Sequence, residues 1–213
     1  MAQKRAFLTV GLLIFDQVEV LDVAGPFEVF SVTRLHERSR QEEPSPFRVL
    51  LVSQKKKEPV VAVGGLRLMP DVSTQECPDL NLLIVPGGFG TRREIKNKKL
   101  IEWIAERASK TGLTASVCTG SSLLGKAGLL DGREATTHWL AFDFLRKCAP
   151  KAKIQPNVRY TLQQPIFTSA GVSSGIDLAL RIVSHYFGDD VGLATARYME
   201  YPFPFDNRRA KTA

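Results

Sequence analysis

One cysteine stands in a sequence context suited to a chemical role. Cys118 lies in "ASVCTGSS", between an apolar run of β type and a small-residue turn that leads toward a helix. A strand, a sharp turn and a helix in this order are typical of a nucleophile elbow, in which Gly120 eases the turn. Unpaired amides and the positive end of the helix dipole would face the sulfur, and both favour the thiolate. We therefore expect a nucleophilic Cys118 with a lowered pKa; the alternative is a buried cysteine that only packs.

An acidic residue follows the first apolar run of the chain. Asp22 stands in "VLDVAGP", four residues before Pro26. It could cap a helix that begins at Pro26, which is a common role for aspartate. It could instead lie against Cys118 and share a proton with it or position a water molecule. The spacing alone favours neither role.

Two glycines follow another apolar run, in "LLIVPGGFG". Because Gly87 and Gly88 have no Cβ, their backbone N–H groups could approach a site closely. Together with the amide of Thr119 they could hold a developing negative charge. The alternative is a plain tight turn. The motif is not a phosphate-binding loop, because the Lys-Ser/Thr ending of such loops is missing.

Three histidines complete the set of candidate groups. His138, in "TTHW", stands between a short strand and a helical pattern, where it could bind substrate and assist proton transfer or serve a structural role. His36 and His185 fall within helical patterns, and we expect them to be packing or surface residues. No histidines and carboxylates share the spacing of metal ligands. We therefore expect neither a metal site nor a cofactor.

The elements that would position these groups alternate between apolar runs and helical patterns. This alternation predicts a three-layer α/β/α sandwich with a mostly parallel central sheet. Asp22, the glycine pair and Cys118 each follow a predicted strand, so all three are expected at the carboxyl edge of the sheet. Strands are predicted at 7–15, 47–53, 81–85, 113–117 and 135–139, with hairpins in 60–69 and 157–171; helices are predicted at 26–38, 100–108, 121–127, 139–148, 176–187 and 188–201.

Composition limits the kinds of protein that this chain can be. It has 213 residues, 44% hydrophobic and 24% charged, as in an ordinary globular protein, and we expect one domain over residues 1–213. Three cysteines without regular spacing (Cys77, Cys118 and Cys148) imply no disulfide framework and suit a reducing cytosol. No apolar run approaches the ~20 residues of a membrane span. A cytoplasmic protein without a membrane partner is expected.

The net charge of +7 does not by itself identify a partner. Lysines and arginines are scattered over several short runs, and aromatic residues do not interleave with them. This pattern favours a solvated basic face over a nucleic-acid site. A small molecule is the expected binding partner.

At the motifs above, the chain resembles the ThiJ/PfpI branch of the class I glutamine-amidotransferase-like superfamily, and within it the isonitrile (isocyanide) hydratases. The resemblance lies in "GLLIFDQVEVLDVAGPFEVF", "LLIVPGGFGTR", "SVCTGSSLLGKAGLLDGREATTHW" and "SAGVSSGIDLAL". It implies a flavodoxin-like fold and a homodimer. It also implies that Cys118 is the nucleophile, Asp22 its acidic partner and Thr119 the threonine that follows the nucleophile.

The resemblance implies a cysteine-dependent hydratase that converts an isonitrile and water into an N-substituted formamide. Thr119 stands where the protease-like members carry histidine, and Asp22 stands where deglycase and oxidation-sensing members carry glutamate. Two alternatives are a glyoxalase or deglycase acting on reactive carbonyls, and a redox or ligand sensor without turnover. Related transcription regulators add a DNA-binding domain after this pattern, and we expect none in a chain that ends at Ala213.

Overall fold

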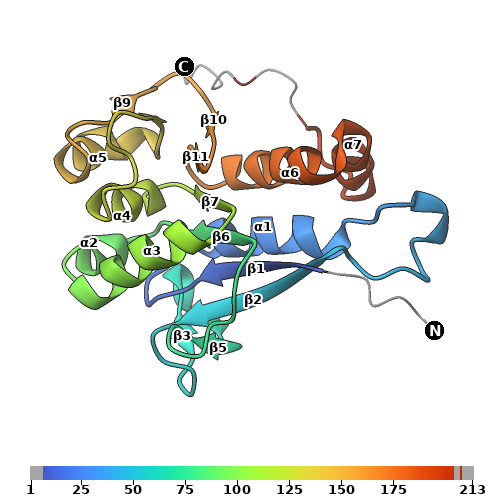
Figure 1. Ribbon diagram of the computed structural model, residues 1–213, viewed down its shortest axis with the longest axis horizontal. Coiled ribbons are helices and arrows are strands. Elements are labelled where there is room, and N and C mark those ends of the chain that lie inside the picture. The colour runs from blue at the N-terminus through green and yellow to red at the C-terminus, as the bar shows by residue number, and fades with distance from the viewer. Residues whose placement is uncertain (1–6, 204–206, 208–213) are drawn as a thin grey trace.

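The computed structural model describes residues 7–203 and residue 207 (Figure 1). Its main sheet has seven strands in the order β10-β11-β7-β6-β1-β2-β5. Every neighbouring pair is parallel except the edge hairpin of β10 and β11. The predicted mostly parallel sheet is therefore confirmed. Its strands are β1 (Leu8–Leu13), β2 (Phe47–Ser53), β5 (Val72–Ser73), β6 (Leu82–Val85), β7 (Leu113–Ser116), β10 (Tyr160–Gln163) and β11 (Ile166–Ser169).

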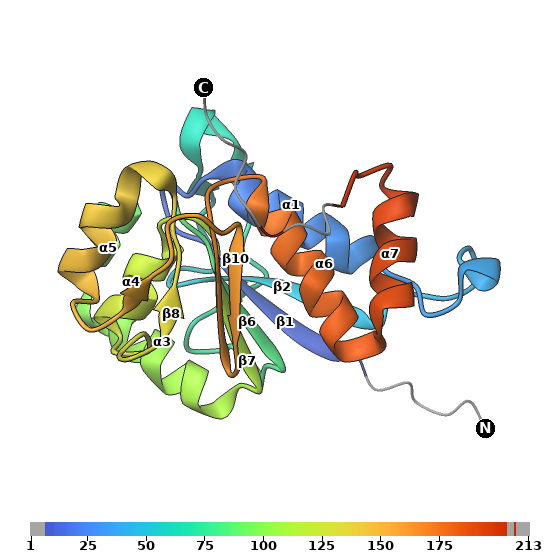
Figure 2. The ribbon, with the colours of Figure 1, turned by 90° about the horizontal axis from the view of Figure 1, so that it is seen from above.

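Helices cover both faces of this sheet, as Figure 2 shows. One layer contains α1 (Val20–Val32), α6 (Ser174–Phe187) and α7 (Asp189–Tyr198). The other contains α3 (Lys98–Lys110), α4 (Gly120–Lys126) and α5 (Phe142–Cys148), with the short α2 (Thr91–Glu94) against α4. The predicted three-layer α/β/α sandwich is therefore confirmed. Within residues 7–203, none of these helices combines the length and the apolar composition that a membrane span requires.

The central strands carry the hydrophobic core. All four residues of β6 and all four of β7 are buried, and Leu12 and Leu13 of β1 are fully buried as well. Such continuous burial is typical of parallel strands covered on both faces. Helix α3 adds Leu100, Ile104 and Ala108 at spacings of four residues, the apolar face that the sequence predicts.

Shorter elements surround the main sheet. The predicted hairpin in 60–69 consists of β3 (Val60–Val61) and β4 (Arg67–Leu68), and Gly64 and Gly65 supply φ angles of 80° and 91° between them. A second small sheet pairs β8 (Glu134–Ala135) with β9 (Lys153–Ile154) in parallel. In the described part of the chain, 3₁₀ helices lie at Glu37–Ser39, Val63–Gly65 and Trp139–Ala141.

The first helix differs from its prediction. The sequence places its start at Pro26 and its end near Arg38, whereas α1 spans Val20–Val32 and Pro26 lies inside it. Proline cannot donate to the carbonyl four residues earlier, which here belongs to Asp22. The buried side chains of Val23, Val29 and Phe30 keep the helix in place around this missing bond. As a result, Asp22 lies within the first turn of α1 rather than in a loop before it.

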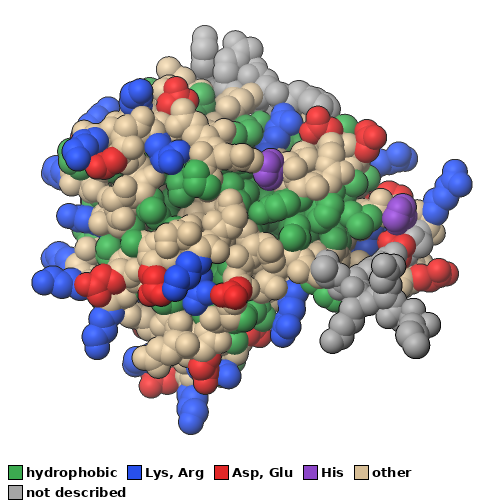
Figure 3. All heavy atoms as spheres, in the orientation of Figure 1, with side chains coloured by type: hydrophobic (Ala, Val, Ile, Leu, Met, Phe, Trp, Pro, Cys, Tyr) green, Lys and Arg blue, Asp and Glu red, His purple; other side chains and the backbone are tan. Residues whose placement is uncertain are grey.

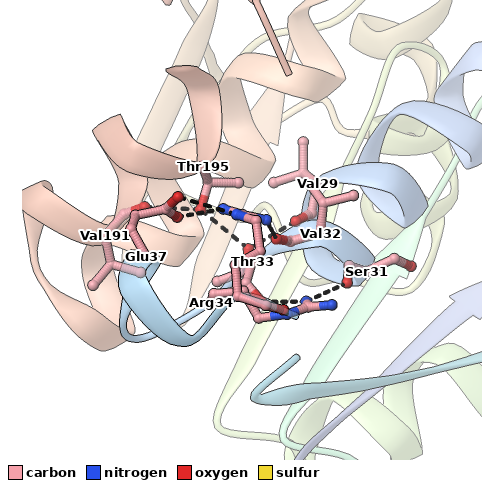
Figure 4. Close-up of polar contacts among 9 residues, drawn as sticks. Val29, Ser31, Val32, Thr33, Arg34, Glu37, Val191 and Thr195 are labelled. Carbon is pink, nitrogen blue, oxygen red and sulfur yellow. Dashed lines mark hydrogen bonds and ion pairs between the residues drawn. The ribbon is translucent and has the colours of Figure 1, made fainter. Parts of the chain in front are cut away.

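The carboxyl end of α1 is joined to α7 by buried hydroxyl groups, shown in Figure 4. The Oγ1 atom of Thr33 donates to the carbonyl of Val29 at 2.7 Å. The Oγ1 atom of Thr195 donates to the carbonyl of Val191 at 2.8 Å and lies 3.4 Å from the Oγ1 of Thr33. We call this contact the Thr33–Thr195 junction. Every hydroxyl in it has a partner, so the junction fixes one end of α1 without leaving a polar group unpaired.

The start of α6 is held by side chains from distant parts of the chain. Ser173 is the N-cap residue but its side chain makes no capping hydrogen bond. Asp177, in the first turn, is fully buried and accepts hydrogen bonds from the Arg159 side chain and from the Tyr201 hydroxyl at 2.9 Å. Tyr201 is thus attached to α6. It begins the segment "YPFPFD" (201–206), of which residues 204–206 lie outside the described residues.

Charged side chains of both signs share the face of the molecule that Figure 3 shows. Lysines and arginines lie around this face with acidic side chains between them, and hydrophobic side chains cross its middle. Exposed ion pairs of the chain include Lys55–Glu58, Lys110–Glu106 and Arg146–Asp143. The view agrees with the scattered pattern of the sequence.

Candidate active site

Three predicted site segments meet at the carboxyl edge of three adjacent strands. Asp22 follows β1, Gly87 follows β6 and Cys118 follows β7, and the order β7-β6-β1 makes these strands neighbours. The chain proceeds from β1 to β2 on one side and returns to β6 on the other, so β1 and β6 flank a topological switch point. Open α/β sheets bind their ligands at such points.

The turn after β7 has the geometry of an elbow. Cys118 has a φ of 57°, a left-handed conformation that is rare for a residue with a side chain. Its amide donates to the carbonyl of Ala170 at 3.1 Å. Gly120 fits against the end of β6, because a Cβ at this position would lie 2.0 Å from the carbonyl oxygen of Val85. The elbow is therefore held by backbone contacts on both sides.

The thiol of Cys118 is neutral at pH 7, so the prediction of a lowered pKa is wrong. Its residue is only 6% exposed, and burial together with the negative charge of Asp22 raises the pKa to about 12. The amides of Thr119 and Val172 and the hydroxyl of Thr119 act on the sulfur in the predicted, opposite direction. They are outweighed because loss of hydration exceeds what a few hydrogen bonds at a seven-residue helix supply.

The carboxyl group of Asp22 is fully buried beside this thiol. Its Oδ2 accepts the N–H of Gly87 at 2.9 Å, while Oδ1 has no conventional hydrogen-bond partner among the described residues. Burial raises its pKa from the ordinary 3.8 to about 8, the charge of Glu19 adds to the rise, and the Gly87 amide and the Cys118 thiol oppose it. Burial therefore favours the protonated forms of both Asp22 and Cys118, and the two groups titrate as a coupled pair.

The glycine amides have a different role from the predicted one. The N–H of Gly87 is used by Asp22, and the N–H of Gly88 donates to the Oγ1 of Thr119 at 3.0 Å. Gly120 donates to Val117 within the elbow. These three amides are therefore not free to hold a developing negative charge. Instead, Gly87 and Gly88 fix the side chains of Asp22 and Thr119, and a Cβ on Gly87 would lie 2.5 Å from the amide nitrogen of Thr119.

Cys118 borders a cavity of about 180 Å³. This volume is small among ligand-binding cavities and suits a molecule of few atoms. Its wall is mostly apolar, with one acidic and one basic residue, and consists of Glu19, Gly88, Phe89, Arg92, Cys118, Thr119, His138, Leu140, Ala141 and Val172. Asp22, which is fully buried, is absent from this lining.

His138 lies in the wall of the cavity and also caps a helix. Its Nδ1 accepts the amide of Leu140 at 3.3 Å, at the start of the 3₁₀ helix Trp139–Ala141. Its ring packs on Gly171, where a Cβ would lie 2.0 Å from the ring Cδ2. Both sequence-based alternatives for His138 are therefore compatible with its position. Within residues 7–203, no group of three or more His, Cys, Asp or Glu side chains is arranged to hold a metal ion.

Sequence reasoning did not single out several residues of this site. Val172, with a φ of 50°, directs its amide at the sulfur of Cys118. Glu19, Phe89 and Arg92 also line the cavity. Glu19 is the N-cap residue of α1, Phe89 follows the glycine pair, and Arg92 lies in α2. Their positions next to candidate residues, in "EVLD" and "GGFGTR", are the only sequence signal for them.

Comparison with known proteins identifies the family of this chain. The model of the DJ-1/PfpI family matches residues 8–185. The isonitrile hydratase of Pseudomonas putida is 34% identical over 208 residues, covering 97% of this chain and 85% of that protein. The transcriptional regulator GbdR of Pseudomonas aeruginosa is 25% identical over 199 residues, and the chain spans 52% of its length. A ThiJ/PfpI family protein from Pseudomonas syringae has the same fold, with a TM-score of 0.82 and 27% identity over 97% of this chain and 79% of that one. The resemblance predicted from the motifs is confirmed: the chain belongs to the DJ-1/PfpI family.

Proposed function

We propose that this protein is an enzyme that hydrates small isonitriles to N-substituted formamides. The observation that carries the proposal is the buried pair of a carboxylic acid and a thiol, Asp22 and Cys118, next to a small and mostly apolar cavity. Similarity to an isonitrile hydratase over nearly the whole chain supports the choice of substrate.

The first step adds the thiol across the terminal carbon of the isonitrile. This carbon carries a lone pair, so it accepts the proton of the Asp22 carboxylic acid. The sulfur of Cys118 forms a bond to the same carbon, and the thiol proton passes to the Asp22 carboxylate. The product is a thioimidate, in which the carbon is bonded to hydrogen and sulfur and doubly bonded to nitrogen. Asp22 ends the step neutral, as it began.

The second step consumes water. The water oxygen bonds to the thioimidate carbon while a proton reaches the nitrogen, which gives a tetrahedral adduct. The carbon–sulfur bond then breaks, the adduct's hydroxyl proton returns to the sulfur through Asp22, and the N-substituted formamide leaves. The amides of Thr119 and Val172, which already contact the sulfur, hold the adduct in place.

A neutral pair suits this reaction better than a stored thiolate. An ion buried at Cys118 would be costly while the site waits for substrate. Isonitrile carbon requires a proton as well as a nucleophile, and the pair supplies both without a standing charge. The other candidate residues support these two: Gly87 and Gly88 orient Asp22 and Thr119, Gly120 shapes the elbow, and His138 borders the substrate.

We further propose that the enzyme works as a cytoplasmic homodimer of one-domain chains and without a cofactor. Phe89, Trp139 and Leu140 expose 66%, 59% and 70% of their surface in the single chain, at and beside the mouth of the cavity. A second copy that covered part of this apolar rim would shield the site from water. Sedimentation at micromolar concentration distinguishes a dimer from a monomer.

The test measures formamide directly. Purified protein with Cys118 reduced is mixed with an alkyl or aryl isonitrile, and loss of the N≡C infrared band is followed together with the formyl proton by NMR. We expect turnover by the wild type, none by Cys118→Ala, and normal turnover by Cys77→Ala, which removes a buried thiol remote from the site. Lactate formed from methylglyoxal would favour a deglycase-like enzyme. Cys118 sulfinate under mild peroxide, without any turnover, would favour a sensor.

A further inference from the structure

The cavity beside Cys118 carries charge of opposite sign on two of its wall residues. Glu19 and Arg92 both line it, and neither makes an ion pair with a described residue. The rest of the wall consists mainly of apolar side chains and backbone. An unpaired charge at the edge of a small cavity is a means of selecting ligands, because it favours one sign of charge at one position.

Glu19 belongs to the reactive end of the cavity. It is the N-cap residue of α1, and its amide donates to the carbonyl of Gly87 at 3.0 Å. Its negative charge reaches Asp22 strongly enough to raise the pKa of that carboxyl group. An anionic group on a ligand is therefore repelled from the end where the sulfur and the carboxylic acid lie.

Arg92 lines the cavity from α2, and its residue is exposed to solvent. Its guanidinium carbon lies 5.9 Å from the ring centroid of Phe89 and 5.4 Å from that of Phe144, whose ring is outside the cavity lining. Both distances are within the range of cation–π attraction. Contacts with the rings hold the guanidinium near the cavity mouth.

The backbone that carries Arg92 is fixed to the candidate active site. Thr91 is fully buried; its Oγ1 donates to the carbonyl of Gly88 at 2.7 Å and lies 3.1 Å from the Oγ1 of Thr119. Thr119 is adjacent to Cys118 in the chain. The base of the Arg92 side chain thus keeps a defined position relative to the sulfur.

The neighbouring Arg93, in contrast, uses its guanidinium in hydrogen bonds within the chain. Arg93 binds the carboxylate of Glu94 through Nε at 2.8 Å and donates through Nη2 to the carbonyl of Asp16 at 3.0 Å. Arg92 has no hydrogen bond or ion pair of this kind within the described chain. Its five N–H donors are therefore open to a ligand, and their planar arrangement matches a carboxylate.

We propose that Arg92 binds a carboxylate at the far end of the substrate, so that the preferred substrates are small isonitriles bearing a carboxylate group. This inference rests on the proposed function for the reaction at Cys118. The carboxylate is drawn to Arg92 and repelled by Glu19, and the two effects together orient the isonitrile carbon toward the sulfur. The apolar wall formed by Phe89, Leu140 and Val172 accommodates the short linker between the two groups.

The test compares two substrates of nearly equal size, isocyanoacetate and isocyanoacetamide, together with the one-carbon-longer pair. We expect the wild type to have the higher kcat/KM for the carboxylate, and Arg92→Met to lower the ratio of carboxylate to amide by about tenfold to a hundredfold, the effect of one charge-assisted contact. Arg93→Met is the matched control, because it removes the same charge one residue away and outside the cavity lining. It should leave the ratio within about twofold of the wild type.

A second measurement is independent of turnover. Propionate should slow the alkylation of Cys118 by iodoacetamide in the wild type and in Arg93→Met, and should not do so in Arg92→Met. Equal kcat/KM for the two substrates, or a ratio that Arg92→Met leaves unchanged, would overturn the inference while leaving the hydratase proposal intact. If neither substrate gives a formamide, the hydratase proposal fails, and protection by propionate alone then decides whether Arg92 is an anion site.

Discussion

Helix α1 has buried polar groups at both of its ends, and the two ends differ in how completely these groups are hydrogen-bonded. At the carboxyl end, the Thr33–Thr195 junction pairs each buried hydroxyl with a carbonyl or with another hydroxyl. At the amino end, Asp22 is equally buried, but one of its oxygens has no conventional partner among the described residues and its pKa is raised to about 8.

The difference separates stability from chemistry within a single helix. A buried polar group that is fully paired adds about 1 kcal/mol of net stability and little reactivity. One that lacks a partner lowers stability, and this cost is typical of sites that exchange protons. Substitutions at Asp22, at its neighbours and at the Thr33–Thr195 junction test whether stability and chemistry are separated in this way.

The largest effect is expected at the sulfur. Cys118→Ala should reduce isonitrile hydration by about a thousandfold or more, because no other group in the cavity can form the thioimidate. Its thermal midpoint should change little, because the backbone hydrogen bonds that hold the elbow, such as that from the Cys118 amide to the Ala170 carbonyl, do not involve the sulfur. Initial rates and thermal melts check both parts. A variant that keeps more than a tenth of the wild-type rate would remove Cys118 from the reaction.

Asp22→Asn should also lower the rate, by about a hundredfold or more, since the amide cannot cycle a proton. At the same time it should raise the free energy of unfolding at pH 7, by on the order of 2 kcal/mol. The sign follows from the raised pKa: between the ordinary 3.8 and about 8, the folded state holds a proton that the unfolded state has lost. The contribution of the Asp22 carboxyl group to the free energy of unfolding of the wild type is therefore fully present below about pH 4 and is lost as the pH rises toward 8.

Urea unfolding at pH 4 and at pH 8 measures this difference. The two proteins should be closest in stability at pH 4, and the Asp22→Asn variant should be the more stable at pH 8. Parallel stability curves for the two proteins across this range would contradict the raised pKa of Asp22.

The opposite end of α1 should respond in the opposite way. Thr195→Val removes a satisfied buried hydroxyl and is expected to cost about 1 kcal/mol, or about 2–4 °C in thermal midpoint for a chain of this size. Because the Thr33–Thr195 junction is remote from the cavity lining, kcat/KM should stay within about twofold of the wild type. A loss of activity as large as that of Asp22→Asn would mean that the two ends of α1 are not separable.

The smallest effect concerns the alkaline limb of the pH profile of kcat/KM. Since Asp22 must enter as a carboxylic acid, kcat/KM for isocyanoacetamide should fall as pH rises through about 8. Glu19→Gln removes a charge that raises the pKa of Asp22, so this limb should move to lower pH, by less than about one unit because Glu19 is only half-buried. A limb that stays in place or moves to higher pH would show that Glu19 does not act on Asp22.

The sequence alone was sufficient to predict the three layers of the fold and the meeting of the site segments at one edge of the sheet. Periodicity predicts β2, the hairpin of β3 and β4 and the apolar face of α3 correctly, because their apolar residues face one core. It does not predict β5 or β9, which have two residues each and too little sequence for a period to appear. It also misplaces the start of α1, since Pro26 is usually found in a first turn.

Within the site, the pattern "SVCTG" predicts the elbow but not the state of its sulfur. The raised pKa of Cys118 depends on burial and on Asp22, while Val172 joins the site from a loop more than fifty residues later in the chain. Likewise, the glycine motif indicates close approach of the backbone at Gly87 and Gly88. Only the folded chain determines that Asp22 and Thr119 take up these amides.

The loop after β11 contacts the nucleophile twice. Its Ala170 carbonyl accepts the amide of Cys118, and two residues later the amide of Val172 reaches the sulfur while its side chain lines the cavity. A ligand too large for the cavity would have to displace this loop. The displacement would move the Val172 amide away from the Cys118 sulfur, the atom with which the ligand reacts. Bulky molecules would therefore be disfavoured twice, once on entry and again in the bond-forming step.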